Sequence, residues 1–228
     1  MELINAPSLA NCPLLDLGDQ VKQLVAGKAD WFHIDIMDGH YVPNLCLPLK
    51  LIGELKALYP HIKADVHLMT ENPTSYIPRL AEQGTDYVSF HMDAERFGRR
   101  LITNIKNHGM KAGVLINPSQ RIDLLEPLID MVDYVVLMTV EPGYPGQKFM
   151  PEAMPRLAEL VDLRQRSGNP FLISIDGGVD MEYAVKCAQL GAEVFVTGVF
   201  TVFNQPEGIE QACLNFKEKV RKGCQTAT

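Results

Sequence analysis

Residues 31–37 read Trp-Phe-His-Ile-Asp-Ile-Met, a short run of mostly branched and aromatic side chains that predicts a buried β-strand. Side chains alternate between the two faces of a strand, so every second residue of this run shares a face. One face carries Phe32, Ile34 and Ile36, and the other carries His33, Asp35 and Met37. We expect the apolar face to pack against helices and the polar face to point to the other side of the sheet.

Seven further runs of this kind occur along the chain, separated by amphipathic helical stretches. The runs are Leu3–Ala10, Ile62–Met69, Tyr87–Met92, Lys111–Asn117, Tyr134–Val140, Phe171–Asp176 and Val194–Phe200. Strands and helices that alternate every ~25–35 residues imply parallel strands joined by helical crossovers. Eight such units predict an α/β fold, a single (β/α)8 TIM barrel. The rival is a doubly wound open sheet, which often has a glycine-rich turn after its first strand, and residues 8–13 contain no glycine.

The composition fits one domain of this kind. Of 228 residues, 46% are hydrophobic and 21% are charged, which provides for a core and argues against disorder. We expect one TIM-barrel domain over residues 1–228, with frayed ends at 1–2 and 223–228. The net charge of −7 argues against a nucleic-acid partner and looks unsuited to an anionic substrate.

The sequence shows no pattern of a membrane segment or of export. No apolar run approaches the ~18 residues of a membrane helix, and the N-terminus lacks the pattern of a signal peptide. The five cysteines, at positions 12, 46, 187, 213 and 224, are irregularly spaced and argue against a disulfide framework. We therefore expect a cytoplasmic protein with reduced cysteines and no membrane partner.

Polar side chains gather at the ends of three predicted strands, where barrel active sites lie. They are His33, Asp35, His67 and Asp176. For one such residue alone, a satisfied hydrogen-bond network is the simpler interpretation, but a divalent cation accounts for all four at once. Two imidazoles and two carboxylates favour zinc, iron(II), manganese or cobalt over calcium or magnesium. His91, which ends the fourth predicted strand, is expected to be structural or to support the site.

Three methionines, Met37, Met69 and Met138, also lie near predicted strand ends. Methionine often fills gaps in a core, and a thioether wall beside a substrate is the alternative interpretation. Glycine-rich turns follow the last three predicted strands, at Glu141–Gln147, at Gly177-Gly178 and at Gly198. Each turn alone is typical of an ordinary connection, but loops at this place in a barrel commonly bind phosphate through backbone N–H groups. Their shared position therefore favours a phosphate site.

Two longer segments, His33–Asn44 and Met138–Phe149, resemble signatures of the ribulose-phosphate 3-epimerase family. The resemblance extends from about Pro7 to the last predicted helix. It implies a TIM barrel with one divalent metal ion that epimerises ketose phosphates at C3, within the pentose phosphate pathway of carbohydrate metabolism. It also implies a small-molecule ketose phosphate as the partner and assembly into a homo-oligomer.

The resemblance further implies roles for individual residues. His33, Asp35, His67 and Asp176 match the metal ligands, and Asp35 and Asp176 also match the catalytic acid and base. The residues that match substrate contacts are Ser8, Met37, Met69 and Met138. The residues assigned to phosphate are Gly143, Gly146, Gly177, Gly178, Gly198 and Val199.

The sequence departs from the family pattern in places. Pro145 interrupts the common G-F-G-G turn and removes an N–H donor. Gly198-Val199-Phe200 replaces the usual Gly-Ser-Ala, which removes a hydroxyl for which Thr201 is a candidate replacement. The spacing before Phe203 and the strand at 31–37 resemble the allulose-6-phosphate 3-epimerases, whereas the turns at 141–143 and 176–178 fit the five-carbon enzymes at least as well.

The resemblance therefore favours a metal-dependent enzyme that converts D-ribulose 5-phosphate to D-xylulose 5-phosphate. The alternative is a 3-epimerase of D-allulose 6-phosphate and D-fructose 6-phosphate, and a more distant one is a phosphosugar-binding barrel without catalysis. In the expected mechanism, the metal stabilises a cis-enediolate as a Lewis acid. One of Asp35 and Asp176 removes the C3 proton, and the other returns a proton to the opposite face.

Overall fold

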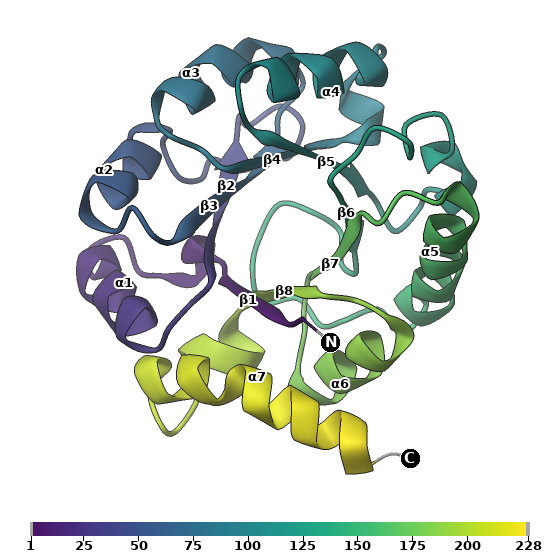
Figure 1. Ribbon diagram of the computed structural model, residues 1–228. Coiled ribbons are helices and arrows are strands. Elements are labelled where there is room, and N and C mark those ends of the chain that lie inside the picture. The colour runs from purple at the N-terminus through teal and green to yellow at the C-terminus, as the bar shows by residue number, and fades with distance from the viewer. Residues whose placement is uncertain (1, 227–228) are drawn as a thin grey trace.

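The structure is a computed structural model that describes residues 2–226. Eight parallel strands form one sheet that curls into a barrel (Figure 1). The strands are β1 (Ile4–Pro7), β2 (Trp31–Met37), β3 (Lys63–Met69), β4 (Tyr87–His91), β5 (Lys111–Ile116), β6 (Tyr134–Met138), β7 (Leu172–Asp176) and β8 (Val194–Thr197). Ladders join consecutive strands from β2 to β8, β8 also pairs with β1, and a parallel bridge between Ser8 and His33 brings the sheet ends together. The predicted TIM barrel is therefore confirmed.

Helices surround the barrel on its outside (Figure 1). The α-helices within residues 2–226 are α1 (Leu17–Ala26), α2 (Lys50–Leu58), α3 (Ile77–Glu82), α4 (Gly98–Asn107), α5 (Ala153–Ser167), α6 (Met181–Leu190) and α7 (Ile209–Thr226). Phe32, Ile34 and Ile36 of β2 are buried in one large core together with apolar side chains of these helices. The alternation predicted for residues 31–37 is confirmed, because the residues between them face the barrel interior.

The connection between β5 and β6 differs from the predicted strand–helix unit. It forms a 3-10 turn, η4 (Ile122–Leu125), followed by further turns, in place of an α-helix. The segment contains Pro118 and Pro127, and proline cannot donate the backbone hydrogen bond that a helix interior needs. All eight predicted strands are present, although β1, β6 and β8 end earlier than predicted, at Pro7, Met138 and Thr197.

Aromatic side chains fill the barrel at the end where the strands begin. The rings of Trp31 and Tyr87 stack with centroids 4.2 Å apart, and the Tyr134 ring meets both of them edge-on. Gly113 of β5, the register partner of Tyr134, leaves the space for that ring, because a Cβ there would lie 2.7 Å from Tyr134 Cδ1. Packed aromatic rings therefore close the barrel interior at the end where the strands begin.

The C-terminal helix is longer than expected. α7 continues to Thr226, so residues 223–226 are helical where the sequence predicts frayed chain. Val220 is fully buried and Gly223 lies against Val185 of α6, which explains why the last turns remain helical. Met1 and residues 227–228 of the predicted frayed ends lie outside the described residues. No helix within residues 2–226 combines the length and apolar character needed to span a membrane.

Candidate active site

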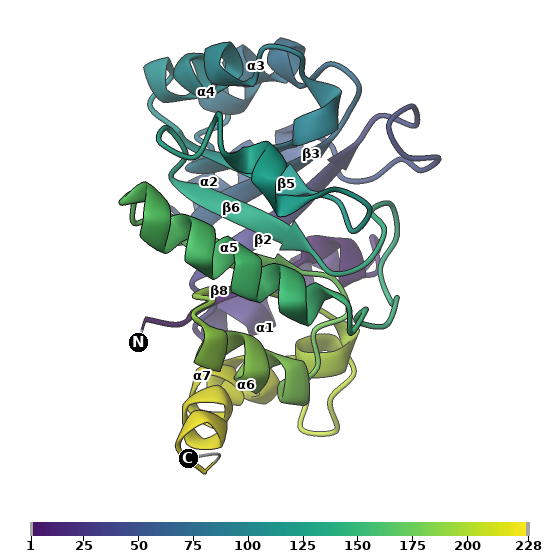
Figure 2. The same cartoon turned by 90° about the vertical axis from the view of Figure 1, so that its right-hand side faces the viewer.

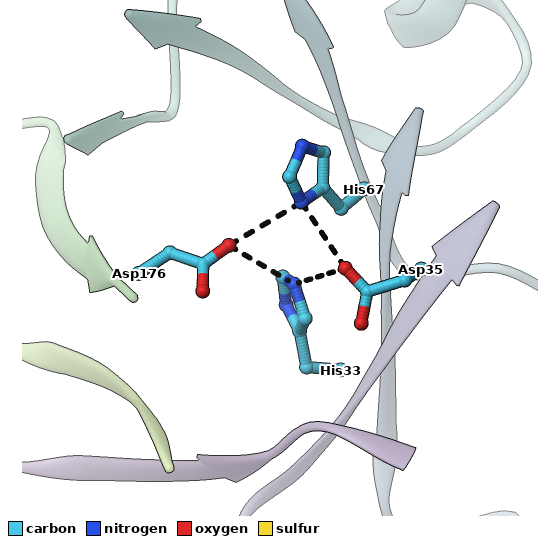
Figure 3. Close-up of side chains that lie close together, drawn as sticks. All are labelled: His33, Asp35, His67 and Asp176. Carbon is cyan, nitrogen blue, oxygen red and sulfur yellow. Dashed lines mark ion pairs between the residues drawn. The ribbon is translucent and has the colours of Figure 1, made fainter. Parts of the chain in front are cut away.

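Four side chains from three strands converge at the C-terminal end of the barrel (Figure 3). β2 supplies His33 and Asp35, β3 supplies His67, and β7 supplies Asp176. One nitrogen or oxygen atom of each lies within 4.8 Å of those of the others. Asp35 and His67 are direct register partners, and the curvature of the barrel brings Asp176 to the same point. The structure thus brings together the four residues that the sequence predicts as metal ligands.

The carboxylate oxygens of this cluster face imidazole nitrogens at short range. Oδ1 of Asp35 lies 3.5 Å from Nε2 of His33 and 3.3 Å from Nδ1 of His67. Oδ2 of Asp176 lies 3.5 Å and 3.3 Å from the same two nitrogens. The two carboxylates therefore lie on opposite sides of the imidazole pair, as Figure 3 shows.

The two imidazoles each direct one unbonded nitrogen into the cluster. Nε2 of His33 and Nδ1 of His67 are buried and make no hydrogen bond. The other ring nitrogens are bonded: Nδ1 of His33 lies 2.7 Å from Oδ2 of Asp65, and Nε2 of His67 lies 2.8 Å from Nε2 of His91. Buried polar atoms are nearly always satisfied, and two bare imidazole nitrogens beside two carboxylate oxygens are a donor set for a divalent transition metal. The residues present fit the predicted metal ion.

Electrostatic interactions couple the four groups. Burial disfavours the charged imidazolium of His33, but Asp35 and Asp65 outweigh it and hold the pKa of His33 well above its ordinary value. Burial also acts to lower the pKa of His67, but Asp176 and Asp35 outweigh this effect and raise that pKa. Burial also opposes the ionisation of Asp35 and Asp176, but the two imidazoles lower the pKa of both carboxyl groups. The carboxylates therefore favour the protonated imidazoles, so a cation that bound these nitrogens would displace protons.

Both carboxylates and the His67 imidazole line the cavity above the cluster, and the carboxylates are the more exposed groups. The side chains of Asp35 and Asp176 are 10% and 13% exposed, whereas those of His33 and His67 are 0% and 1% exposed. Ser8, which follows β1, donates from Oγ to Oδ2 of Asp35 at 2.7 Å. Asp35 therefore directs one oxygen to the imidazoles and the other to the cavity side.

One cavity collects the residues that the sequence predicts for substrate and phosphate. Its lining includes Ser8, Met37, Met69, Met138, Gly143, Gly146, Gly177, Gly178, Gly198 and Val199. The loops that follow the strands gather at this end of the barrel, on the right in Figure 2. No lysine or arginine of residues 2–226 lines the cavity, so its walls offer an anion only uncharged donors, from the backbone and from side chains such as Asn11 and Gln147.

The three methionines both fill the core and line the cavity. Met37 and Met69 are register partners on β2 and β3 and pack against Val42 of the loop after β2. Met138 is the register partner of Asp176. Each methionine is almost completely buried, so these side chains give the cavity an apolar wall beside the carboxylates.

The turn after β6 is held in place on two sides. Within the turn, Gln147 donates from Nε2 to the carbonyl oxygen of Glu141 at 2.7 Å. From the loop after β2, Asn44 donates from Nδ2 to the carbonyl oxygen of Gly143 at 2.9 Å. Gly178 approaches this turn so closely that a Cβ would lie 2.6 Å from the carbonyl oxygen of Gln147, and its φ is +62°. The turn and the Gly177-Gly178 segment therefore form one wall of the cavity.

Two residues beside the predicted phosphate site differ from expectation. Thr201, the candidate replacement for the family's hydroxyl, does not line the cavity, and its Oγ1 is buried without a hydrogen bond. Asn11, which was not predicted to belong to the site, does line it. Asn11 donates from Nδ2 to the carbonyl oxygen of Ser8 at 3.0 Å, and a Cβ on Gly198 would lie 3.3 Å from Asn11 Oδ1. Its signal in the sequence was a polar side chain just beyond the first predicted strand.

Asp65 and Tyr134 support His33, and neither residue was predicted to have a role. Tyr134 donates from Oη to Oδ1 of Asp65 at 2.8 Å, and Oδ2 of Asp65 is bonded to His33. Asp65 had only a partial signal in the sequence, because it shares a strand face with His67, whereas its pairing with His33 depends on the register between β2 and β3. No feature of the sequence indicated a role for Tyr134, because its hydrogen bond to Asp65 crosses the barrel interior from β6.

Solved structures with low sequence identity share this fold. The KGPDC from Streptococcus mutans aligns with a TM-score of 0.70 at 13% identity, covering 97% of this chain and 99% of that chain. A 3-hexulose-6-phosphate synthase aligns with a TM-score of 0.63 at 16% identity, covering 98% and 99%. At such identities the comparison supports the barrel fold alone.

Sequence relatives are much closer. The profile of the ribulose-phosphate 3-epimerase family matches residues 4–203. The chain is 40% identical over 194 residues to the ribulose-phosphate 3-epimerase of Bacillus subtilis, covering 85% of this chain and 89% of that protein. It is 38% identical over 209 residues to ribulose-phosphate 3-epimerase 1 of Cupriavidus necator, covering 89% and 85%. A match of this extent on a barrel with this cluster means that the chain belongs to the ribulose-phosphate 3-epimerase family and is an epimerase, an enzyme of the isomerase class.

Proposed function

We propose that the enzyme interconverts D-ribulose 5-phosphate and D-xylulose 5-phosphate by inverting the configuration at C3. The observation that carries this proposal is the pair Asp35 and Asp176, two carboxylates that lie on opposite sides of an imidazole pair and open onto one cavity. The relatives named ribulose-phosphate 3-epimerase support the choice of substrate.

The reaction requires an acid–base group on each face of C3. Epimerisation beside a ketone removes a proton from one face of the carbon and returns a proton to the other. After the first step the reacting carbons are planar, so a single fixed carboxylate reaches only one face. Asp35 and Asp176 provide one carboxylate for each face, and their roles as base and acid exchange when the direction of reaction reverses.

The residues that would hold the metal are His33, Asp35, His67 and Asp176. A divalent cation bound there supplies a Lewis acid beside the sugar oxygens next to C3. The buried imidazoles only bind, whereas each carboxylate keeps a second oxygen for proton transfer. Ser8 holds Oδ2 of Asp35 at 2.7 Å and thereby fixes the direction in which this carboxylate meets C3.

The rest of the cavity orients the sugar. We assign the phosphate group to the backbone around Gly177-Gly178, Gly198-Val199 and the turn that contains Gly143 and Gly146, because glycine backbone allows an anion to approach its N–H groups closely. The apolar wall of Met37, Met69 and Met138 then lies beside the reacting carbons and excludes water from them.

In D2O, the enzyme is expected to form xylulose 5-phosphate that carries deuterium at C3. The carboxyl group that returns the second proton exchanges with solvent, so the incoming hydrogen is solvent-derived. Proton NMR of product collected early in the reaction measures the label. Unlabelled product would contradict proton transfer by two carboxylates, and failure to convert ribulose 5-phosphate would contradict the proposed substrate.

Ribulose 5-phosphate is expected to have a kcat/KM at least about tenfold higher than allulose 6-phosphate, since one extra carbon in a fixed site typically costs ~10–200-fold. The phosphate backbone and the carboxylate pair are both held by the barrel, so the number of carbons between C3 and the phosphate decides the fit. Parallel assays of the two sugars with the same enzyme preparation measure the ratio. A higher value for allulose 6-phosphate would assign the enzyme to the six-carbon reaction.

A further inference from the structure

His91 lies directly behind His67 and does not line the cavity. It ends β4, its side chain is fully buried, and its Nε2 lies 2.8 Å from Nε2 of His67. The other nitrogen of His67, Nδ1, faces the carboxylates of Asp35 and Asp176 at 3.3 Å. His67 therefore connects the ligand cluster on one side to His91 on the other.

The contact between the two ring nitrogens determines where the protons lie. A hydrogen bond between them requires an N–H on one ring and a bare nitrogen on the other. Nδ1 of His67 must be bare to bind a cation, so the proton of its neutral ring lies on Nε2. That N–H donates to His91, whose Nε2 must be bare and whose own proton must lie on Nδ1.

The far side of His91 matches this arrangement. Nδ1 of His91 and Oδ1 of Asn117 are both buried and make no hydrogen bond. The orientation of the amide is fixed independently, because Asn117 donates from Nδ2 to Oη of Tyr41 at 2.7 Å and to Oδ2 of Asp93 at 3.3 Å. The Nδ1 position of His91 is thus not bonded to any acceptor that competes for its orientation, and Oδ1 of Asn117 is an unused acceptor in the same buried region.

Tyr41 holds His91 from a second direction. The two rings lie against each other with centroids 4.6 Å apart. Tyr41 is fixed in turn, because it donates from Oη to Oδ1 of Asp93 at 2.8 Å. With Asn117 and Tyr41 on its far side and His67 in front, the His91 ring keeps its Nε2 directed at His67.

The two imidazoles of the cluster thus have unlike partners. His33 is backed by the carboxylate of Asp65 at 2.7 Å, and His67 is backed by a ring nitrogen. Asp35, Asp65 and Asp176 already place three carboxylates in this buried region. A carboxylate behind His67 would add a fourth buried charge at a high solvation cost. A ring nitrogen orients His67 without that charge.

We propose that His91 is the positioning residue of His67: it accepts the Nε2 proton of His67 and thereby holds the bare Nδ1 toward Asp35 and Asp176 for the cation. His91 itself touches neither substrate nor cation. The inference deepens the proposed function and rests on it, because it assigns a further residue to the proposed metal site. Groups that orient a metal-binding histidine in this way typically change metal affinity by ~10–100-fold.

Titration of the metal-free enzyme with Co²⁺, followed by the visible absorption of the bound ion, tests this role. His91→Leu removes the acceptor and is expected to weaken Co²⁺ binding by about 10–100-fold. His91→Gln, whose carboxamide oxygen can replace Nε2 as acceptor, is expected to weaken it by less than about threefold. His61→Leu, the same change at an exposed histidine, is the matched control and should bind like the unmodified enzyme. Circular dichroism of each metal-free variant checks that it is folded.

A second measurement requires no variant. In the unmodified enzyme loaded with Zn²⁺, nitrogen-15 NMR of labelled histidines should show the proton of His67 on Nε2 and that of His91 on Nδ1. The opposite tautomer of either ring, Co²⁺ binding by His91→Leu as tight as by the unmodified enzyme, or binding by His91→Gln as weak as by His91→Leu would overturn the role of His91. Unmodified enzyme that binds no Co²⁺ would instead overturn the metal site, and the proposed function with it.

Discussion

Asp176→Asn is expected to lower kcat for epimerisation by about 10²–10⁴-fold, and Asp35→Asn by a similar factor. The amide keeps the size of the carboxylate but cannot accept a proton, so one face of C3 loses its acid–base group. Steady-state assays with ribulose 5-phosphate measure the loss. Asp162→Asn, at an exposed position of α5, is the control that should retain full activity.

Hydrogen exchange separates the loss of a proton-transfer group from the loss of metal. Each single variant, once loaded with metal, retains one carboxylate on one face of C3. It should therefore exchange the C3 hydrogen of one epimer with D2O without inverting that carbon. We expect Asp35→Asn and Asp176→Asn to exchange opposite epimers. Near-normal turnover by metal-loaded Asp176→Asn, or exchange of both epimers by one variant, would rule out one carboxylate for each face.

Removal of the divalent metal with a chelator is expected to abolish epimerase activity, and restoring the metal is expected to recover it. The same removal should lower the melting temperature, because a ligand at 100 times its Kd stabilises the folded state by about 2.7 kcal/mol. Activity assays and thermal unfolding, together with elemental analysis of the protein, measure both effects. Full activity in protein shown to be metal-free would contradict the metal requirement.

The effect of metal removal has a pH dependence of defined sign. The pKa values of His33 and His67 in the metal-free protein lie above the ordinary 6.5. Their charges therefore contribute stability that is fully present below pH 6.5 and is lost as pH rises through the raised pKa values. Metal binding has to displace these protons, so metal affinity should increase over the same range. Melting temperatures and Kd values measured from pH 6.5 upward test both trends.

The barrel and the ligand cluster could be predicted because both depend on local periodicity. Residues 31–37 show which side chains of one strand share a face, and all parallel strands of a barrel end at the same place. His33, Asp35, His67 and Asp176 could therefore be brought together without knowledge of the register between strands. The net charge of −7 was a poor guide to the cavity, because the backbone groups assigned to phosphate carry no formal charge.

The partners behind the imidazoles could not be predicted, because they depend on the stagger between strands and on how rings share space. The bond from Tyr134 to Asp65 crosses the barrel interior and requires the space beside Gly113. The expectation that Thr201 would supply a hydroxyl to the cavity was wrong for a similar reason. The segment η5 (Val199–Phe203) is a π-helical turn in which the amide of Thr201 bonds back to the carbonyl of Gly198, and the Thr201 hydroxyl is buried.

The four side chains that meet within 4.8 Å are distributed very unevenly along the chain. His33, Asp35 and His67 are translated early, whereas Asp176 is translated nearly half the chain length after His67. A growing polypeptide on the ribosome can thus offer the proposed site three ligands at most until β7 has emerged. The complete set of four proposed ligands is therefore a property of the finished barrel, which nascent or truncated chains that lack β7 do not have.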